Sequence, residues 1–257
     1  RGTNDAGLTY DIVELTATTL RLHAQTDDAN CQPGGGYFSF IFTRISDDGG
    51  VVGGDGYQGA DSYPGMTLVW GDEFNTPGAP DPSKWTYDLG NGNWGWGNGE
   101  IQYYHSSNLQ VSDGTLKITA KKEPIGNFNY SSGRMKTQGN YSFRYGKMEV
   151  KAKLPASQGT WPAIWLLGNT HSTLGWPFCG EIDVMEQRGD GKSYVLGTTH
   201  WNNGSVYSPA SYSRDSKEIE NLDSEWHIYT MDYYSHKTER NHVLCSNMDT
   251  AGSHKLN

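Results

Sequence analysis

The segment YSFRYGKMEVKAKL, residues 141–154, alternates apolar and polar side chains over most of its length. Met148, Val150 and Ala152 occupy every second position, and the phase of the alternation changes at Gly146. Period-two alternation is typical of a strand with one buried face. A glycine at the change of phase favours a β-bulge. The segment therefore predicts a half-buried strand with a bulge at its glycine.

Similar strand-like runs recur on both sides of this segment, separated by Gly, Pro, Asn and Asp. They are TLVWGDEFN, LQVSDGTLKITAKK, TWPAIWLLG, EIDVMEQ and WHIYTMDYY. We find no internal repeat and no long helical pattern. The 257 residues include 33 Gly, 16 Tyr and 9 Trp, and only 19% are charged, which is typical of a turn-rich β protein. We therefore expect an all-β protein with two packed antiparallel sheets.

Changes in composition divide the chain into three parts. Residues 1–45 predict a small β segment, in which residues 8–24 form two short strands with a turn near TATT and GGGYFSFIFTRI forms a third. Residues 46–66 are rich in Gly and Asp and predict a linker. Residues 67–257 predict one large β domain. Its last part, residues 234–257, lacks the period-two pattern and forms an atypical tail.

Charge and hydropathy exclude several classes of partner. The net charge of −9 disfavours nucleic acid and anionic membrane surfaces, so a neutral ligand fits better. No apolar run approaches the roughly 20 residues of a membrane helix, so we expect no membrane span. The first residues, RGTND, do not form a signal peptide, and we expect any export signal to have been removed. Three cysteines without metal-binding spacing predict no disulfide framework and no zinc site.

The segment EIDVMEQ, residues 181–187, carries three acids within six residues. On a helix the three carboxylates would diverge. On a regular strand Glu181 and Asp183 share a face, whereas Glu186 points to the other face. One extra residue in a β-bulge, at Val184 or Met185, would return Glu186 to the face of the other two. We predict such a bulge.

With the bulge, the two glutamates could lean together to the roughly 5 to 5.5 Å that retaining glycosidases use between nucleophile and acid/base. Asp183 would hold one glutamate in position. Its charge would raise the pKa of a neighbouring carboxyl, so that one carboxyl stays protonated near neutral pH. From spacing alone, three acids that bind a cation or simply face solvent are an equally good interpretation.

The residues that flank these acids favour a saccharide cleft. Trp161, Trp165 and Trp176 precede the acids and Trp201 follows them. Sugar rings stack on aromatic faces through their C–H edges. Core packing remains an alternative role for each of these tryptophans.

Several stretches together resemble glycoside hydrolase family 16, and within it the laminarinase-like endo-β-1,3-glucanases. They occur in family order from about Thr67 to Tyr233: WGDEFN, DPSKWTYDLGNGNWGWGNGEIQYY, VSDGTLKITAKKE, GRMKTQGNYSFRYGKMEVKAKLPASQGTWPAIWLLG, GWPFCGEIDVMEQRG and TTHW. The resemblance implies a jelly-roll β-sandwich with a glycan cleft on its concave face. The ExDxxE form of the acid motif is similar to that of laminarinases, whereas lichenases typically have ExDxE.

The resemblance also implies residue roles. Glu181 matches the family's nucleophile, Asp183 its assisting acid and Glu186 its acid/base. By the same resemblance, Asn98, Arg134, Trp161, Trp165 and His200 are expected to bind substrate. Trp176 is added to this set because it flanks the acids. Structural hydrogen bonding is the alternative role for Asn98 and Arg134.

The activity that the resemblance implies is endo-acting hydrolysis of β-1,3-glucan with retention of anomeric configuration, through a covalent glycosyl-enzyme. We expect no metal in the active site and no cofactor, a monomer, and an extracellular, periplasmic or cell-surface location where the polysaccharide is met. The alternatives are a mixed-linkage β-1,3-1,4-glucanase, another hydrolase of the family such as a marine-galactan hydrolase, a glucan-binding protein without turnover, and an inactive fragment.

The resemblance does not extend over the two ends of the chain. The family's W…VDG pattern, Gly-Trp-Pro-rich loop and final DYVRVY-like strand are not visible after Tyr234. A sandwich without those strands would expose apolar surface and unpaired strand edges. The family's structural calcium site usually takes a ligand from the last strand, so a structural calcium here would lack that ligand. Residues 1–45 resemble the end of an accessory β domain.

Overall fold

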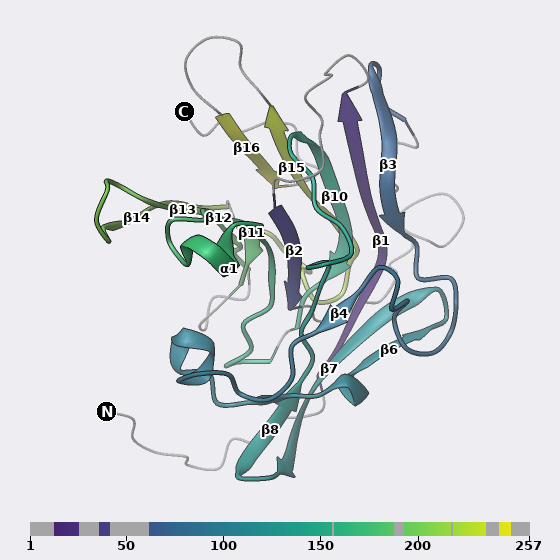
Figure 1. Cartoon of the computed structure of the whole chain (residues 1–257). Coiled ribbons are helices and arrows are strands. Elements are labelled where there is room, and N and C mark those ends of the chain that lie inside the picture. The colour runs from purple at the N-terminus through teal and green to yellow at the C-terminus, as the bar shows by residue number, and fades with distance from the viewer. Residues whose placement is uncertain are drawn as a thin grey trace.

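Two β-sheets stack to form the protein, as Figure 1 shows. The computed structural model describes residues 13–25, 36–41, 62–155, 157–187, 193–216, 218–234 and 242–247. Within these ranges nearly all strand pairs are antiparallel, and the short pair β5–β8 is parallel. The predicted all-β sandwich is confirmed.

The first sheet has nine strands. In spatial order they are β16 (His242–Asn247), β15 (His227–Tyr234), β10 (Gly146–Lys153), β1 (Val13–Gln25), β7 (Thr115–Ile125), β8 (Phe128–Ser132) and β5 (Tyr103–Tyr104), with β3 (Met66–Asp72) also paired to β1 and β6 (Leu109–Ser112) also paired to β7.

The second sheet has seven strands. In spatial order they are β14 (Pro209–Asp215), β13 (Leu196–Asn202), β12 (Glu181–Glu186), β11 (Ala163–Gly168), β2 (Gly36–Ile41), β9 (Met135–Lys136) and β4 (Thr86–Tyr87). The helices of the described residues are short: a π-helical turn (Gly95–Gly99), a 3-10 turn (Ser106–Asn108) and α1 (His171–Leu174). None of them is long and apolar enough to cross a membrane.

The hydrophobic core lies between the two sheets. Met148 and Val150 on β10 are buried in it, and Ile164 on β11 and Val184 on β12 meet them from the second sheet. The alternation in the segment 141–154 therefore marks a core-facing strand. The strand is not half-buried, however, because Glu149, Lys151 and Lys153 on its other face are buried as well. Packing of both inner faces fixes β12, which carries the acids, against the rest of the sandwich.

The predicted bulge at Gly146 is wrong. Strand β10 begins at Gly146, and its pairing with β15 is regular from Gly146 to Ala152. Tyr145 and Gly146 have φ values of 62° and 133°, which an extended strand does not adopt. The change of phase in the sequence thus marks the start of the strand.

The N-terminal part of the described chain belongs to both sheets. Strand β1 is one continuous strand, not the predicted pair of strands, and its pairing with β10 shifts between Ala17 and Thr19 where a turn was expected. Strand β2 confirms the third predicted strand and pairs with β11 and β9. Both strands thus pair with strands of the predicted large domain. The division at residues 45 and 66 stays a prediction, because residues 42–61 lie outside the described residues.

The tail predicted to be atypical contributes an edge strand. Strand β16 pairs along one side with β15, from Tyr229 to Tyr234, and is the outermost strand of its sheet. The remaining tail residues, 235–241 and 248–257, lie outside the described residues.

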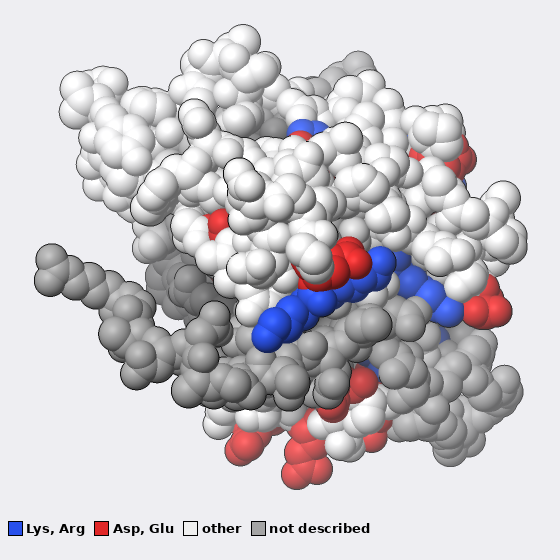
Figure 2. Space-filling model, turned by 90° about the horizontal axis from the view of Figure 1, so that it is seen from below, with Lys and Arg blue, Asp and Glu red and all other residues white. Residues whose placement is uncertain are grey.

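Basic side chains form a continuous band across the middle of the face shown in Figure 2, with acidic side chains beside it, and most of the described surface around the band is uncharged.

Candidate active site

A bulge in β12 sorts the side chains of the EIDVMEQ segment onto two faces. From Asp183 to Glu186 the strand advances three residues while its partner β13 advances only two, from Thr198 to Leu196. Its other neighbour, β11, shows the same shift, because consecutive residues of β11 pair with Asp183 and Met185 and omit Val184. Val184 is therefore the extra residue, and the predicted bulge is confirmed.

The bulge explains the burial pattern of the strand. Val184 and Met185 are consecutive, yet both are fully buried in the core, and Ile182 packs against that core. With these side chains on the core side, Glu181 and Glu186 lie on the opposite face with Asp183. A regular strand would have placed Glu186 among apolar side chains.

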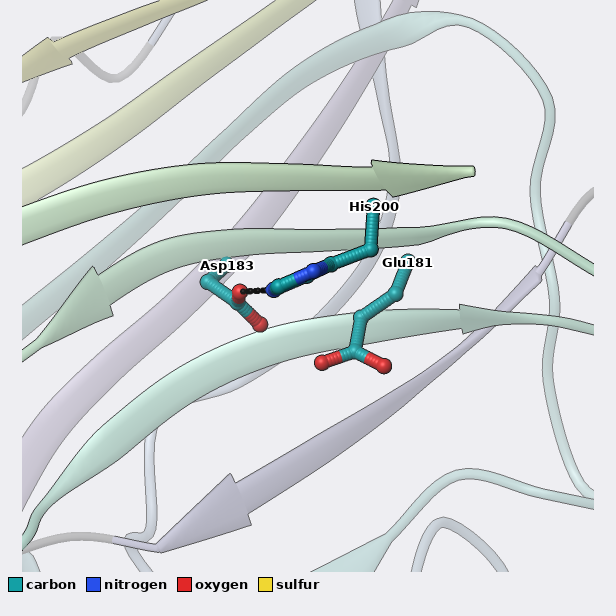
Figure 3. A group of neighbouring side chains, drawn as sticks. All are labelled: Glu181, Asp183 and His200. Carbon is teal, nitrogen blue, oxygen red and sulfur yellow. Dashed lines mark hydrogen bonds and ion pairs between the residues drawn. The ribbon is translucent and has the colours of Figure 1, made fainter. Parts of the chain in front are cut away.

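Asp183, Glu181 and His200 form a compact cluster, shown in Figure 3. His200 on β13 lies directly opposite Glu181 on β12, and its Nε2 is 3.1 Å from Asp183 Oδ2. One ligand-type atom from each of the three residues lies within 4.8 Å of the others. Directly opposed residues of neighbouring strands share a face, which explains why His200 reaches the acids.

Burial and mutual repulsion change the protonation of this cluster. Burial first, and then the charge of Asp183, raise the pKa of Glu181 to about 8. The hydrogen bond to Asp183 raises the pKa of His200, and burial opposes this. The sequence predicted one carboxyl that stays protonated near neutral pH, and in the structure that carboxyl is Glu181.

Glu186 receives a hydrogen bond from a tryptophan. Trp161, just before β11, donates from Nε1 to Glu186 Oε1 over 2.8 Å. An indole N–H can only donate, so it favours an acceptor oxygen at Oε1. Trp161 thus orients the Glu186 carboxyl through Oε1.

Arg134 lies between two indole rings beside the acids. Its guanidinium carbon is 4.8 Å from the ring centre of Trp96 and 4.9 Å from that of Trp165. Trp165 is directly opposite Asp183 on the neighbouring strand. The Arg134 side chain is mostly buried, and its Nε lies 2.9 Å from Asp88 Oδ2 as an ion pair. The pair fixes the guanidinium against both rings.

The other two predicted substrate-binding residues, Trp176 and Asn98, contact different parts of the site. Trp176 is 39% exposed, and its ring is 6.0 Å from that of His200. Asn98 is exposed on the π-helical turn and donates to Glu100 Oε1 over 3.1 Å. Glu100 also accepts from the hydroxyl of Tyr104 at 2.6 Å, whose ring lies near Arg134. Asn98 is therefore linked to Arg134 through Glu100 and Tyr104, and not directly to the acids of β12.

Trp201 does not face the acids. It follows His200 on a regularly paired strand and lies opposite Ala210 of β14, so its side chain points to the other face of the sheet. Asp88 and Trp96 were not identified from the sequence as site residues. The aromatic, glycine-rich stretch WGWGNGE contains Trp96, whereas nothing local marks Asp88, whose role depends on a partner far along the chain.

The cluster of Glu181, Asp183 and His200 offers ligand atoms that could also hold a cation. The observed contact between the imidazole and the carboxylate needs no ion. The absence of a metal and a cofactor from the reaction stays a prediction.

Comparisons with known proteins bear on the family and the fold of the chain. The sequence model of the family described as Glycosyl hydrolases family 16 matches residues 94–239. The chain is 45% identical to the Beta-glucanase of Rhodothermus marinus over 150 residues, which is 56% of this chain and 52% of that protein. It is 37% identical to Glucan endo-1,3-beta-glucosidase A1 of Niallia circulans over 183 residues, or 65% of this chain and 27% of that protein. The chain thus spans about half of one relative's length and about a quarter of the other's.

A solved structure shows the same fold. The laminarinase catalytic domain from Thermotoga maritima superposes with a TM-score of 0.61 at 37% identity, over 70% of this chain and 73% of that one. This likeness confirms the jelly-roll β-sandwich that the sequence implied.

Proposed function

The chain belongs to glycosyl hydrolase family 16, and on that premise we propose that it is an endo-acting, retaining hydrolase of β-1,3-glucosidic bonds in laminarin-type glucans. The observation that carries the proposal is the Val184 bulge, which brings Glu181, Asp183 and Glu186 to one face of β12. A glucanase, an endo-1,3-beta-glucosidase and a laminarinase among the relatives support the substrate class.

In the first half of the proposed reaction Glu186 acts as the acid. Its proton passes to the glycosidic oxygen while the bond from that oxygen to the anomeric carbon breaks. A carboxylate oxygen of Glu181 bonds to the anomeric carbon from the other side of the sugar ring and forms a covalent glycosyl-enzyme.

In the second half Glu186 acts as the base. It takes a proton from water, and the resulting hydroxide oxygen attacks the anomeric carbon and displaces Glu181. Two inversions return the original configuration. The Trp161 hydrogen bond holds Glu186 in place for both proton transfers.

Asp183 and His200 control the nucleophile in this proposal. Attack requires Glu181 as a carboxylate, whereas its raised pKa keeps it protonated at neutral pH in the free protein. The proton must therefore pass from Glu181 to solvent water before the first step. His200, when protonated, lowers the pKa of Glu181 and favours that loss.

Proton NMR of the protein with laminarin tests the reaction and its stereochemistry together. We expect β-anomeric signals in the first minutes, and α-anomers only later by mutarotation. The Glu181→Gln variant, which lacks the nucleophile, should release no sugar. Early α-anomers would refute retention, and no new anomeric signal at all would refute the hydrolase.

The linkage preference is tested by initial rates on laminarin, lichenan and agarose. We propose that laminarin is hydrolysed fastest. A faster rate on lichenan would indicate a mixed-linkage glucanase, and a faster rate on agarose a galactan hydrolase. Binding without turnover on all three would indicate a glucan-binding protein. We also propose that the protein acts outside the cytoplasm, where a polymeric glucan is met.

A further inference from the structure

A row of aromatic rings leads away from the acid cluster over the surface. The ring of Trp176 lies 6.0 Å from that of His200, and the ring of Tyr207 lies 6.5 Å from that of Trp176. Trp176 is 39% exposed and Tyr207 is 63% exposed. The aromatic surface therefore continues outward past the last residue assigned to the cleft.

The loop that carries Tyr207 is held by hydrogen bonds from one side chain. Asn202, at the end of β13, donates from Nδ2 to the carbonyls of Gly204 and Val206 and accepts at Oδ1 from the backbone N–H of Ser208. The Val206 and Ser208 bonds are 2.9 Å and 2.7 Å long. These bonds flank Tyr207 on both sides in the sequence. The loop is thus ordered before a ligand arrives, which lowers the entropy cost of binding.

Tyr207 differs from a neighbouring exposed aromatic residue on the same sheet. Tyr212 on β14 lies opposite Thr199, the residue before His200, so its side chain points to the sheet face away from the acids. Tyr207 instead contacts Trp176, which in turn contacts His200. Of the two tyrosines, only Tyr207 is continuous with the acid-bearing face.

We propose that Tyr207, together with Trp176, forms an outer subsite that binds a further glucose unit of a β-glucan chain lying in the cleft. This inference rests on the proposed function. The exposed ring offers an apolar face to the C–H groups of a sugar, and the phenol hydroxyl can exchange hydrogen bonds with sugar hydroxyls. A glucan long enough to reach past Trp176 gains this contact, and a shorter one does not.

Calorimetric binding of β-1,3-linked glucose oligomers of two to six units tests the subsite without turnover. The parent protein for this test carries Glu181→Gln, which removes the nucleophile. We expect its affinity to rise with length until the outer subsite is filled. Adding Tyr207→Ala should lower the affinity for the longest oligomers about 2- to 13-fold, as expected for loss of one aromatic contact, and leave the shortest unchanged.

Two matched variants separate contact from structure. Tyr207→Phe keeps the ring and should retain most of the gain with length, whereas Tyr212→Ala removes an exposed tyrosine from the opposite face and should match the parent. An equal loss at every length for Tyr207→Ala, or no loss, would overturn the subsite while the wild-type rate on laminarin still supports the hydrolase. No binding of any oligomer by the parent would overturn the subsite, and no laminarin hydrolysis by wild type would overturn the proposed function.

Discussion

Replacing Glu181 by Gln should stabilise the folded protein, and the gain should grow as the pH rises. Burial and Asp183 raise the Glu181 pKa from 4.5 to about 8 in the folded state. Between these two values the unfolded chain loses the proton while the folded chain keeps it. The folded state then binds more protons, so the free energy of unfolding falls as pH increases, and above about pH 8 the full cost is present. Glutamine has no proton to lose and avoids this cost.

The size of the gain follows from the difference between the two pKa values. At about 1.4 kcal/mol for each pKa unit, the upper limit is about 5 kcal/mol. Glu181 and His200 titrate as an interacting pair, so the shift does not belong to Glu181 alone, and we expect roughly 2 to 4 kcal/mol at high pH. For a chain of this size that corresponds to about 4 to 16 °C in the midpoint of thermal unfolding.

Thermal unfolding followed by circular dichroism from pH 4 to pH 9 measures the gain directly. The midpoints of wild type and Glu181→Gln should nearly coincide at pH 4 and separate steadily up to about pH 8. Glu220→Gln, at an exposed carboxyl, provides the matched control and should show no such trend. A difference that stays constant over the whole range, or shrinks as pH rises, would refute the assignment of the raised pKa to Glu181.

Three further changes test the rest of the site. Val184→Ala should lower the free energy of unfolding in urea by about 1 to 3 kcal/mol but keep laminarin hydrolysis. Deletion of Val184 should abolish hydrolysis, because it turns Glu186 toward the core. Equal activity of the two variants would contradict the bulge. Trp161→Phe removes the donor to Glu186 and should lower kcat about 10- to 150-fold with little change in KM; an effect on KM alone would mean that the indole only binds sugar. Asp183→Asn removes the charge that raises the Glu181 pKa, so the acidic limb of kcat/KM against pH should move to lower pH; an unmoved limb would show that burial alone sets it.

That the three acids share one face of β12 could be predicted from the sequence, because it depends only on how side chains alternate along a single strand. Three acids at spacings of two and three residues share one strand face only if one extra residue lies between Asp183 and Glu186. The sequence could not choose between Val184 and Met185, since that depends on which residues β11 and β13 pair with. The same alternation decides which tryptophans can face the acids. Trp201 directly follows His200 on a regularly paired strand, so the two side chains point to opposite faces of the sheet.

Features that depend on distant partners could not be predicted in the same way. Asp88 acquires its role only because the chain brings it against Arg134, far along the sequence. The sequence predicted two strands where the structure has the single strand β1, because a short polar run within a strand resembles a turn. Its irregular pairing near Thr18 shows that a bulge can have the same local composition.

The position of β1 between β10 and β7 has a consequence for how the chain assembles. Thr16 to His23 pair with residues Lys153 to Lys147, so partners in the middle of one sheet are separated by more than a hundred residues of chain. During synthesis β1 is made long before β10 exists. Its partners β3 and β7 are made earlier than β10, but the edge of β1 that pairs with β10 stays open until residues 147–153 have been made. Contacts of such high contact order form slowly. Pairing of β1 with β10 is therefore expected to limit the folding rate. A chaperone would be most useful while the β10-facing edge of β1 is still unpaired.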